Sequence, residues 1–497
     1  MNPSSRPLPP RTLPARTLML ARVHFIGIGG IGMCGLAELL HNMGSTVSGS
    51  DLTENAQVVR LREIGIKVEI GQRPENVRGA EVVVYSSAVK PTNPEYAEAR
   101  RLKIPLIPRA ESLAEIMRLK RGVAVGGSHG KTTTTSMIAA IFLEARTEPT
   151  IVVGGRLDLI KSTAVLGTGD WMIAEADESD GSFSRLNPEI ALVTNIDNDH
   201  LDHYGTFEHL KKAFFDFASR VPFYGSAIVC WDDPVIRETF APFGKRLVRY
   251  GFSDDCDIRL LGEKGLYQVF VYGELKGSFQ LHVPGRHNAL NAAAALATAL
   301  EGGIDFETAV RGLDRFRGVD RRFQHKGAVG VIDVFDDYGH HPTEIEAVLK
   351  AYRERYGDRR LIVAFQPHRF TRTKLCWEQF LTCFALADRV FITDIYAAGE
   401  DPLAGIDAVS MIAGIKAQDS KYIPSEGVTR IEAKGGLTPI LRVTAELLAK
   451  ELTSKAPIKS KSDVEGVSLF TLGAGDIWKL SGEVLDVLNQ ETKASRK

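Results

Sequence analysis

The chain has 497 residues, which at roughly 150 residues per domain favours about three domains. Lysine plus arginine number 61 and aspartate plus glutamate 62, so the net charge of -1 excludes a nucleic-acid binder that works by bulk charge. With 44% hydrophobic and 25% charged residues, the composition excludes disorder, collagen and coiled coil as whole-chain descriptions. No apolar run reaches ~18 residues, so we expect no membrane-spanning helix.

The cysteines and the N-terminal segment indicate the compartment. The 5 cysteines are scattered and never form a CxxC pair, which argues against a disulfide framework or a thiolate zinc site and favours a reducing cytoplasm. Residues 1–21 are rich in proline and arginine and contain no acid. Their only apolar segment, residues 18–21, is too short for a signal peptide, so they are predicted to be a disordered basic leader.

Residues 22–120 are predicted to form the first domain. An apolar run at 22–28 stops at a glycine cluster, and a helical pattern follows at 33–42. Further strands are expected at 46–49, 66–70 and 81–85. Strands that alternate with helices predict a Rossmann-like domain with a parallel sheet.

The same alternation predicts two more α/β domains. A helix over 107–121 leads into the central domain, residues 121–316, and the C-terminal domain, residues 317–497, is expected to be Rossmann-like. The strands and helices expected in the central domain are at 122–125, 171–174, 191–194, 227–230, within 257–283, and at 288–300. The strands expected in the C-terminal domain are at 331–335, 361–365, 390–393 and 469–472, with a surface loop at 454–462.

The first glycine cluster fits a nucleotide site. Gly27, Gly29 and Gly32 satisfy GxGxxG between a strand and a helix, with Gly30 inside the motif. Asp51 lies 19 residues after Gly32, where an acid often meets a ribose hydroxyl. Such glycines let backbone N–H groups approach a diphosphate at a helix N-terminus. The motif predicts a dinucleotide or nucleotide-sugar site without separating the two, and a turn without a ligand is the alternative.

A second glycine-rich turn, GGSHGKTTT at 126–134, predicts a P-loop-type ATPase domain. Val125 stands where the strict GxxxxGK[ST] pattern has its first glycine, so the generic pattern fails. The mechanics still apply, because Lys131 can neutralise phosphate oxygens and Thr132 can offer its hydroxyl to Mg²⁺. The expected phosphate-binding residues are Gly127, Ser128, His129, Gly130, Lys131, Thr132 and Thr133.

Acidic clusters follow two strands of the central domain. Glu175 directly follows an apolar strand and is our choice as a Mg²⁺ ligand. Asp177, Glu178 and Asp180 are expected in a loop or facing substrate, and a solvated acidic turn is the alternative for these three. The cluster NIDNDHLDH at 195–203 could hold a second metal or orient substrate.

Asparagine side chains begin the alanine-rich helix. Asn288 and Asn291 lie three residues apart and share one helical face. Their amides suit the edge of an adenine, because each both donates and accepts hydrogen bonds. Capping of the helix by Asn288 is a second interpretation, compatible with the first.

Two motifs follow strands of the C-terminal domain, DDYGHHPTE at 336–344 and QPHRFTR at 366–372. Arg369 and Arg372 suit a carboxylate or a phosphate, with a solvated basic turn as the alternative. His340 and His368 could bind metal, but beside arginines they are better explained as substrate contacts.

Taken in order, these segments resemble the Mur ligase family, the ATP-dependent amide ligases of peptidoglycan precursor synthesis. The resemblance runs from about residue 22 to GAGDIWK at 473–479, and the family's shorter GxxGKTT loop accounts for Val125. The motifs most similar to the members that use L-alanine are the glycine-rich opening at 27–32, EADESDGSF at 175–183, DDYGHHPTE, QPHRFTRT at 366–373 and DIYAAGEDP at 394–402.

The resemblance implies a reaction between UDP-N-acetylmuramate, L-alanine and ATP. The lactyl carboxylate attacks the γ-phosphate to form an acyl phosphate, which the amine of L-alanine then attacks, with release of ADP and phosphate. Two anions meet in the first step, so cations are needed. These are Lys131, Mg²⁺ on Thr132 and Glu175, and by resemblance a second Mg²⁺ on His200.

The resemblance also implies a role for each site residue. The UDP-sugar would be held by Gly27, Gly29, Gly30, Gly32, Asp51, Ser86, Ser87 and Arg109, so GxGxxG would not bind NAD. Asn288 and Asn291 would meet adenine, Asp337 the ribose and Arg322 a phosphate. The amino-acid pocket would comprise Tyr338, His340, His368, Arg369 and Arg372. The residues expected to act in catalysis are Lys131, His200, Arg369 and Arg372.

Three alternatives stay open. A nicotinamide-dependent dehydrogenase built on residues 22–120 leaves the GKTTT loop unexplained. A non-catalytic nucleotide switch would turn over ATP slowly and independently of any amino acid. A sister ligase that attaches a recycled murein tripeptide should have a more open amino-acid pocket. We expect a bacterial cytoplasmic monomer or homodimer without nucleic-acid or membrane partners.

Overall fold

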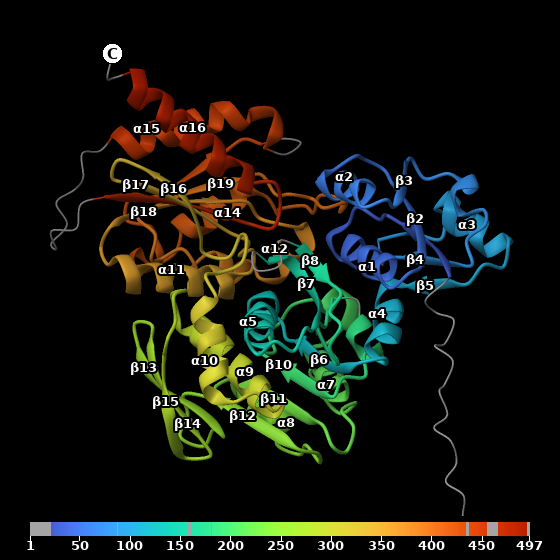
Figure 1. The fold of residues 1–497 in the computed structure, drawn as a ribbon. Helices are drawn as coiled ribbons and strands as arrows, with labels where there is room; N and C mark the ends of the chain where they lie inside the picture. Colours follow the sequence, from blue (N-terminus) through green and yellow to red (C-terminus); the bar gives the residue numbers. More distant parts are fainter. Residues whose placement is uncertain are drawn as a thin grey trace, which may run out of the picture.

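The computed structural model describes residues 21–86, 88–157, 162–179, 181–433, 437–454 and 466–494. These residues form three sheets with flanking helices, and the units lie side by side in chain order from blue to red (Figure 1). Residues 1–20 of the predicted leader and 455–462 of the predicted surface loop lie outside the described residues. The three-domain α/β prediction is confirmed.

The first sheet has the strand order β3-β2-β1-β4-β5, and every neighbouring pair is parallel. Ile26 of β1 pairs with Ser50 of β2, so the glycine loop after β1 begins beside Asp51. The elements are β1 (Arg22–Ile26), α1 (Ile31–Asn42), β2 (Thr46–Asp51), α2 (Ala56–Glu63), β3 (Lys67–Ile70), η2 (Pro74–Val77), β4 (Val82–Tyr85), α3 (Pro94–Arg101), β5 (Leu106–Pro108) and the connecting α4 (Arg109–Met117).

The central sheet has the order β15-β14-β13-β12-β11-β10-β6-β9-β7-β8. β8 at one end and β14 and β15 at the other pair antiparallel, and the strands between them are parallel. Its strands are β6 (Arg121–Gly126), β7 (Thr150–Leu157), β8 (Ser162–Val165), β9 (Trp171–Glu175), β10 (Ile190–Val193), β11 (Ser226–Cys230), β12 (Leu247–Gly251), β13 (Ile258–Glu263), β14 (Leu266–Val271) and β15 (Glu274–Gln280). Its helices are α5 (Lys131–Glu144), η3 (Ser182–Arg185), α6 (Leu201–Tyr204), α7 (Phe207–Ala218), α8 (Pro234–Phe240), α9 (Arg286–Glu301) and α10 (Phe306–Arg315).

The third sheet has the order β16-β17-β21-β18-β19-β20, with only β16 antiparallel to its neighbour among the described strands. Its strands are β16 (Gln324–Val329), β17 (Ile332–Asp337), β18 (Arg360–Phe365), β19 (Arg389–Thr393), β20 (Val428–Ile431) and β21 (Val467–Leu472). Its helices are α11 (Pro342–Tyr356), α12 (Phe370–Leu375), α13 (Trp377–Phe380), α14 (Ala408–Lys416), η4 (Ser420–Tyr422), η5 (Thr438–Ile440), α15 (Leu441–Ser454) and α16 (Trp478–Ala494).

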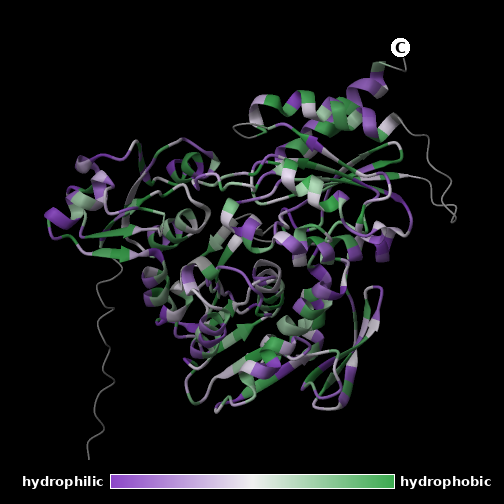
Figure 2. Ribbon diagram, turned by 180° about the vertical axis from the view of Figure 1, so that it is seen from behind, coloured by the Kyte–Doolittle hydropathy of each residue, from purple (hydrophilic) through white to green (hydrophobic). Residues whose placement is uncertain are grey.

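Apolar strands form the interior, and hydrophilic residues colour much of the outer helix surface (Figure 2). The third sheet has a separate buried cluster on each face, whereas one buried cluster joins the first unit to the central one. There α1 packs against β7 and β8. The buried core therefore continues across the boundary proposed at residue 121. No helix among the described residues is long and apolar enough to cross a membrane.

Candidate active site

The phosphate loop connects β6 to α5 and depends on two glycines. Gly127 has φ +131°, and a Cβ there would lie 1.9 Å from Thr194 Oγ1, directly after β10. Gly130 has φ +81°, and its Cβ would lie 2.7 Å from Asn291 Oδ1 of α9. A side chain at either position would be strained and would collide with a neighbour. The loop is therefore held closely against β10 and α9.

Lys131, the first residue of α5, folds back over this loop. Its ammonium donates to the carbonyl oxygens of Gly127 at 2.6 Å and Ser128 at 3.2 Å. It also pairs with Glu178 Oε1 at 2.7 Å. The cation thus lies where a phosphate between the loop and α5 would need it.

Glu178 is the buried carboxylate of this site and is only 1% exposed. Burial raises its pKa to about 7, although Lys131 acts in the opposite direction. Its Oε2 has no hydrogen-bond partner among the described residues, and Oε1 lies 3.8 Å from His200 Nε2. The alternative of a solvated acidic turn is therefore wrong for Glu178, while Asp180 lies outside the described residues.

Glu175 ends β9 beside the phosphate loop, because Val125 of β6 pairs with it in register. The carboxylate accepts hydrogen bonds from Gly154 N, at 2.9 Å, and from the Thr132 side chain, and burial raises its pKa. The structure thus brings Thr132 and Glu175 together, and both offer the oxygen ligands that Mg²⁺ prefers. His200, the third expected ligand, instead contacts Glu178 and, at 3.5 Å, Asp199 Oδ2.

A cavity of about 850 Å³ lies between the central and C-terminal units. Of the expected ATP-binding residues, those that line it are His129, Gly130, Thr133, Asn288, Asn291, Arg322 and Asp337. Asn291 Nδ2 donates to Asn288 Oδ1 at 3.3 Å, and Asn288 Nδ2 donates to Pro284 O at 2.7 Å. The N-cap of α9 is Gly285, so the prediction that Asn288 caps this helix is wrong. Sequence reasoning also missed Phe252 and Arg286, which stack at 3.7 Å in the cavity wall.

Asp337 ends β17 at the edge of this cavity. It accepts hydrogen bonds from the backbone N–H groups of Phe323 and Gly339, each at 2.6 Å. Burial raises its pKa to about 6, although Arg322 and these two hydrogen bonds favour the ionised form. Asp337 is therefore a fixed acceptor beside the phosphate loop.

The expected amino-acid pocket forms a cluster of rings on the C-terminal unit. The ring centroid of His340 lies 5.3 Å from that of Tyr338 and 5.9 Å from that of His368. Burial lowers the pKa of His340 to about 3 and of His368 to about 4, so both imidazoles are neutral at physiological pH. Tyr396 stacks on His368 with centroids 5.5 Å apart and was not assigned from sequence.

Arg372 joins this cluster to the central unit. Its Nε and Nη2 donate to Oδ1 and Oδ2 of Asp199, each at 3.3 Å, and both side chains are 8% exposed. Arg369 is the N-cap of α12 with φ +68° and is only partly buried. A solvated basic turn is therefore excluded for Arg372.

The residues expected at the UDP-sugar surround the N-terminus of α1. Gly29 N donates to Asp51 Oδ2 at 2.8 Å, and a Cβ on Gly32 would lie 2.8 Å from Arg109 Nη1. Arg109 also reaches Asp177 of the central unit at 3.5 Å. Ser86 follows β4 at the same edge of the sheet, and Ser87 lies outside the described residues.

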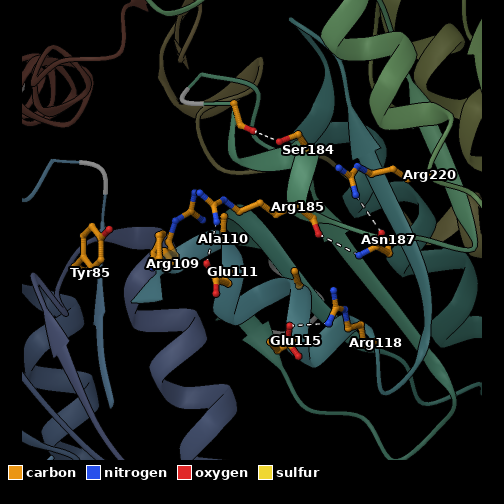
Figure 3. Close-up of a pocket in the computed structure, with 13 residues that line it drawn as sticks. Tyr85, Arg109, Ala110, Glu111, Glu115, Arg118, Ser184, Arg185, Asn187 and Arg220 are labelled. Atoms are coloured by element: carbon orange, nitrogen blue, oxygen red, sulfur yellow. Dashed lines mark hydrogen bonds and ion pairs between the residues drawn. The ribbon is translucent and has the colours of Figure 1, made fainter. Parts of the chain in front are cut away.

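A second cavity, of about 660 Å³, adjoins Arg109 between the first and central units. Figure 3 shows Tyr85 and Arg109 at one end of its lining and Asn187 and Arg220 at the other. Between them, Arg185 of η3 pairs with Glu111 of α4 at 2.9 Å. Arginines outnumber acids in this lining, which favours an anionic occupant.

The three units match one family in order. The Mur ligase family catalytic domain matches residues 22–121, the Mur ligase middle domain 125–299 and the Mur ligase glutamate ligase domain 321–434. A UDP-N-acetylmuramate–L-alanine ligase of Bdellovibrio bacteriovorus is 54% identical over 477 residues, which is 95% of this chain and 100% of that protein. The chain belongs to the Mur ligase family.

Solved Mur ligases share the fold. A UDP-N-acetylmuramate–alanine ligase from Thermotoga maritima superposes with a TM-score of 0.76 at 27% identity, covering 95% of this chain and 100% of that one. A murein peptide ligase from Psychrobacter arcticus gives a TM-score of 0.68 at 22% identity, covering 94% of this chain and 98% of that one. The second likeness concerns the fold alone.

Within this Mur ligase, sequence reasoning left out Tyr396 as well as Phe252 and Arg286, and it gave Glu178 no specific role. Glu178 was expected in a loop or facing substrate, together with Asp177 and Asp180, and only its burial against Lys131 distinguishes it. Tyr396 lies in the motif at 394–402, but its contact with His368 depends on a bridge between two loops. The motif was therefore a usable signal for Tyr396, whereas Glu178 gave none beyond its charge.

Proposed function

We propose that this Mur ligase joins L-alanine to the lactyl carboxylate of UDP-N-acetylmuramate and converts ATP into ADP and phosphate. The names of its relatives support the substrates, and the 54% identity over nearly the whole chain supports the transfer. The observation that carries the proposal is the Arg372–Asp199 pair. It joins the ring cluster of the C-terminal unit to the loop beside Lys131.

The chemistry of each site residue determines its role in the reaction. Lys131 offsets the negative charge that develops when the carboxylate attacks the γ-phosphate. Asn288 and Asn291 orient the adenine, Asp337 the ribose and Arg322 a phosphate. The glycine loop with Asp51, Ser86, Ser87 and Arg109 holds the UDP-sugar. Catalysis by these groups consists of positioning and charge stabilisation.

The amino acid is held by complementary charge and by the rings. Arg369 and Arg372 face its carboxylate, while Tyr338, His340 and His368 enclose its small side chain. Because His340 and His368 are neutral, each imidazole keeps one unprotonated nitrogen that can accept a hydrogen bond.

The oxygen donors at the phosphate loop fit Mg²⁺. Thr132 and Glu175 would hold one ion and His200 a second, and the unpartnered Oε2 of Glu178 provides a further oxygen near His200. Bound Mg²⁺ supplies positive charge that neutralises phosphate oxygens.

Two features favour this proposal over its alternatives. A nicotinamide enzyme or a nucleotide switch needs no ring cluster beside the phosphate loop. The sister ligase that takes a tripeptide needs an open pocket, whereas Arg372 here is buried and close enough to His340 and His368 to lower the pKa of both. We also propose a cytoplasmic protein with domain boundaries near residues 121 and 317.

The test is phosphate release with UDP-N-acetylmuramate and ATP, with L-alanine, glycine, L-serine or the tripeptide added separately. We expect L-alanine to stimulate release most, with glycine and L-serine weaker, because small side chains differ by only ~1–3 kcal/mol in a pocket. Stimulation by the tripeptide alone would instead identify the sister ligase, and no stimulation by any of the four compounds would refute ligase activity.

A further inference from the structure

Three side chains from different elements meet beside the phosphate loop and form what we call the His129 cluster: His129, Asp197 and His341. His129 belongs to the phosphate loop, Asp197 follows β10, and His341 is the N-cap of α11 in the C-terminal unit. One ligand atom from each lies within 4.8 Å of the others. None of the three residues is among the expected Mg²⁺ ligands Thr132, Glu175 and His200, although His129 and Asp197 line the nucleotide cavity.

The two imidazoles converge on one carboxylate oxygen. His129 Nε2 lies 2.8 Å and His341 Nδ1 3.6 Å from Asp197 Oδ2. Donors around a tetrahedral metal with bonds of about 2.0–2.1 Å are separated by roughly 3.3 Å, so these distances lie on either side of the required spacing.

His341 contributes an unexplained polar atom. Its side chain is completely buried and faces the backbone N–H of Glu344 in a capping box, but Nδ1 makes no well-aligned hydrogen bond among the described residues. At 3.6 Å from Asp197 Oδ2, Nδ1 is too far away to donate a hydrogen bond. A cation between the two atoms would satisfy both, whereas a buried nitrogen without a partner is costly.

The opposite nitrogen of each imidazole already has an outer partner. His129 Nδ1 lies 3.4 Å from Glu344 Oε1, and His341 Nε2 lies 3.2 Å from Cys376 Sγ. Metal-bound histidines characteristically use their second nitrogen in this way, because the outer contact fixes the ring orientation. Asp197 is held as well, since Oδ1 accepts from Asn198 N and Oδ2 from Thr343 Oγ1, each at 2.8 Å.

We propose that His129, Asp197 and His341 form a binding site for a divalent transition-metal ion of the zinc type. Two imidazoles and one carboxylate suit Zn²⁺ or Co²⁺, whereas Mg²⁺ prefers sites in which most ligands are oxygens. The ion replaces the hydrogen that His129 and Asp197 share. It links the phosphate loop to α11 and so fastens the central unit to the C-terminal unit beside the nucleotide cavity.

The test measures metal binding by the full chain without nucleotide or UDP-sugar, in excess Mg²⁺ so that oxygen-ligand sites are filled. Zn²⁺ retained after equilibrium dialysis is counted by mass spectrometry, and the visible absorption of Co²⁺ reports nitrogen coordination. We expect one tightly bound ion per chain. His129→Gln and His341→Gln should each weaken binding by about tenfold or more.

The matched control is His325→Gln, because His325 also pairs with an aspartate, at 2.7 Å, but lies exposed on β16. It should bind Zn²⁺ as the unmodified chain does. Circular dichroism checks that each variant folds. If His341→Gln does not fold, the Zn²⁺ binding of His129→Gln alone tests the proposal. Unchanged binding in a folded cluster variant, or no bound ion in the unmodified chain, would overturn the proposal. Either result leaves the proposed ligase activity standing, because no turnover is measured.

Discussion

The buried ion pair between Arg372 and Asp199 allows a quantitative test of how the C-terminal unit is held on the central one. Replacing Arg372 by methionine keeps most of the side-chain volume but removes the cation. Asp199, which is buried in the unmodified chain, then loses its arginine and keeps His200 as a nearby basic group. The neighbouring Arg369→Met is the matched control, because Arg369 is the N-cap of the helix that carries Arg372 and is only partly buried.

The expected size follows from the geometry. Unit charges 3.3 Å apart attract by about 5 kcal/mol at an effective dielectric constant near 20, and desolvation offsets part of this attraction. Removing one partner of a buried pair costs about 3–5 kcal/mol, because the other charge stays buried without the cation that compensated it. Arg372→Met should therefore lower the free energy of unfolding by that amount. Arg369→Met should lower it by about 1 kcal/mol or less.

A double-mutant cycle in urea separates the pair from other effects. Asp199→Asn keeps an oxygen that accepts the hydrogen bond from His200 N. In the double variant it removes the Asp199 charge that Arg372→Met alone leaves without its arginine. We expect a coupling energy on the order of 2 kcal/mol and a double variant more stable than Arg372→Met. Phosphate release should stay low in both, because the substrate carboxylate has lost Arg372. Additive effects within about 0.5 kcal/mol would refute the reasoning.

Three further predictions concern the phosphate loop and the nucleotide cavity. Lys131→Ala should lower phosphate release by about 10³-fold or more while uridine-nucleotide binding, measured by calorimetry, persists; loss of both would argue against separate sites. Asn288→Ala and Asn291→Ala should each raise KM for ATP about fivefold and leave KM for the UDP-sugar unchanged, since one hydrogen bond contributes about 1 kcal/mol. An equal rise for both substrates would contradict adenine binding. Asp337, with its pKa raised from 3.8 to about 6, should make the protein lose roughly 3 kcal/mol of stability as pH rises from about 4 to 6, because the folded state keeps a proton that the unfolded chain releases. If urea unfolding of Asp337→Asn shows the same loss of stability between these pH values, another group causes the loss.

The ends of parallel strands explain why much of the site was predictable. Val125 pairs with Glu175, Gly126 with Val193, and Asp337 with Leu472, so the polar motifs after these strands must gather at sheet edges. The positions of the motifs directly after strands were therefore enough to predict that they lie together, because parallel strands carry the loops that follow them to one edge of the sheet.

Other parts could not be predicted from local pattern. β16 and β20 are edge strands of the third sheet, and their mixed burial leaves no continuous apolar run. Glu178 differs from its acidic neighbours only by its tertiary position. The contact between Arg372 and Asp199 spans 173 residues of sequence, and no local period encodes such a distance.

The carboxylates at the junction between the central and C-terminal units all have more than one cationic or hydrogen-bonding neighbour. Asp199 contacts His200 as well as Arg372, and Asp197 contacts His129 as well as Thr343. Glu344 likewise contacts its own unit's His340 as well as His129. If the two units separate, each carboxylate keeps a partner within its own unit, and none becomes an isolated charge. When the units move apart, these carboxylates can therefore exchange one partner for another. Substrates can then enter and products leave without a large electrostatic barrier.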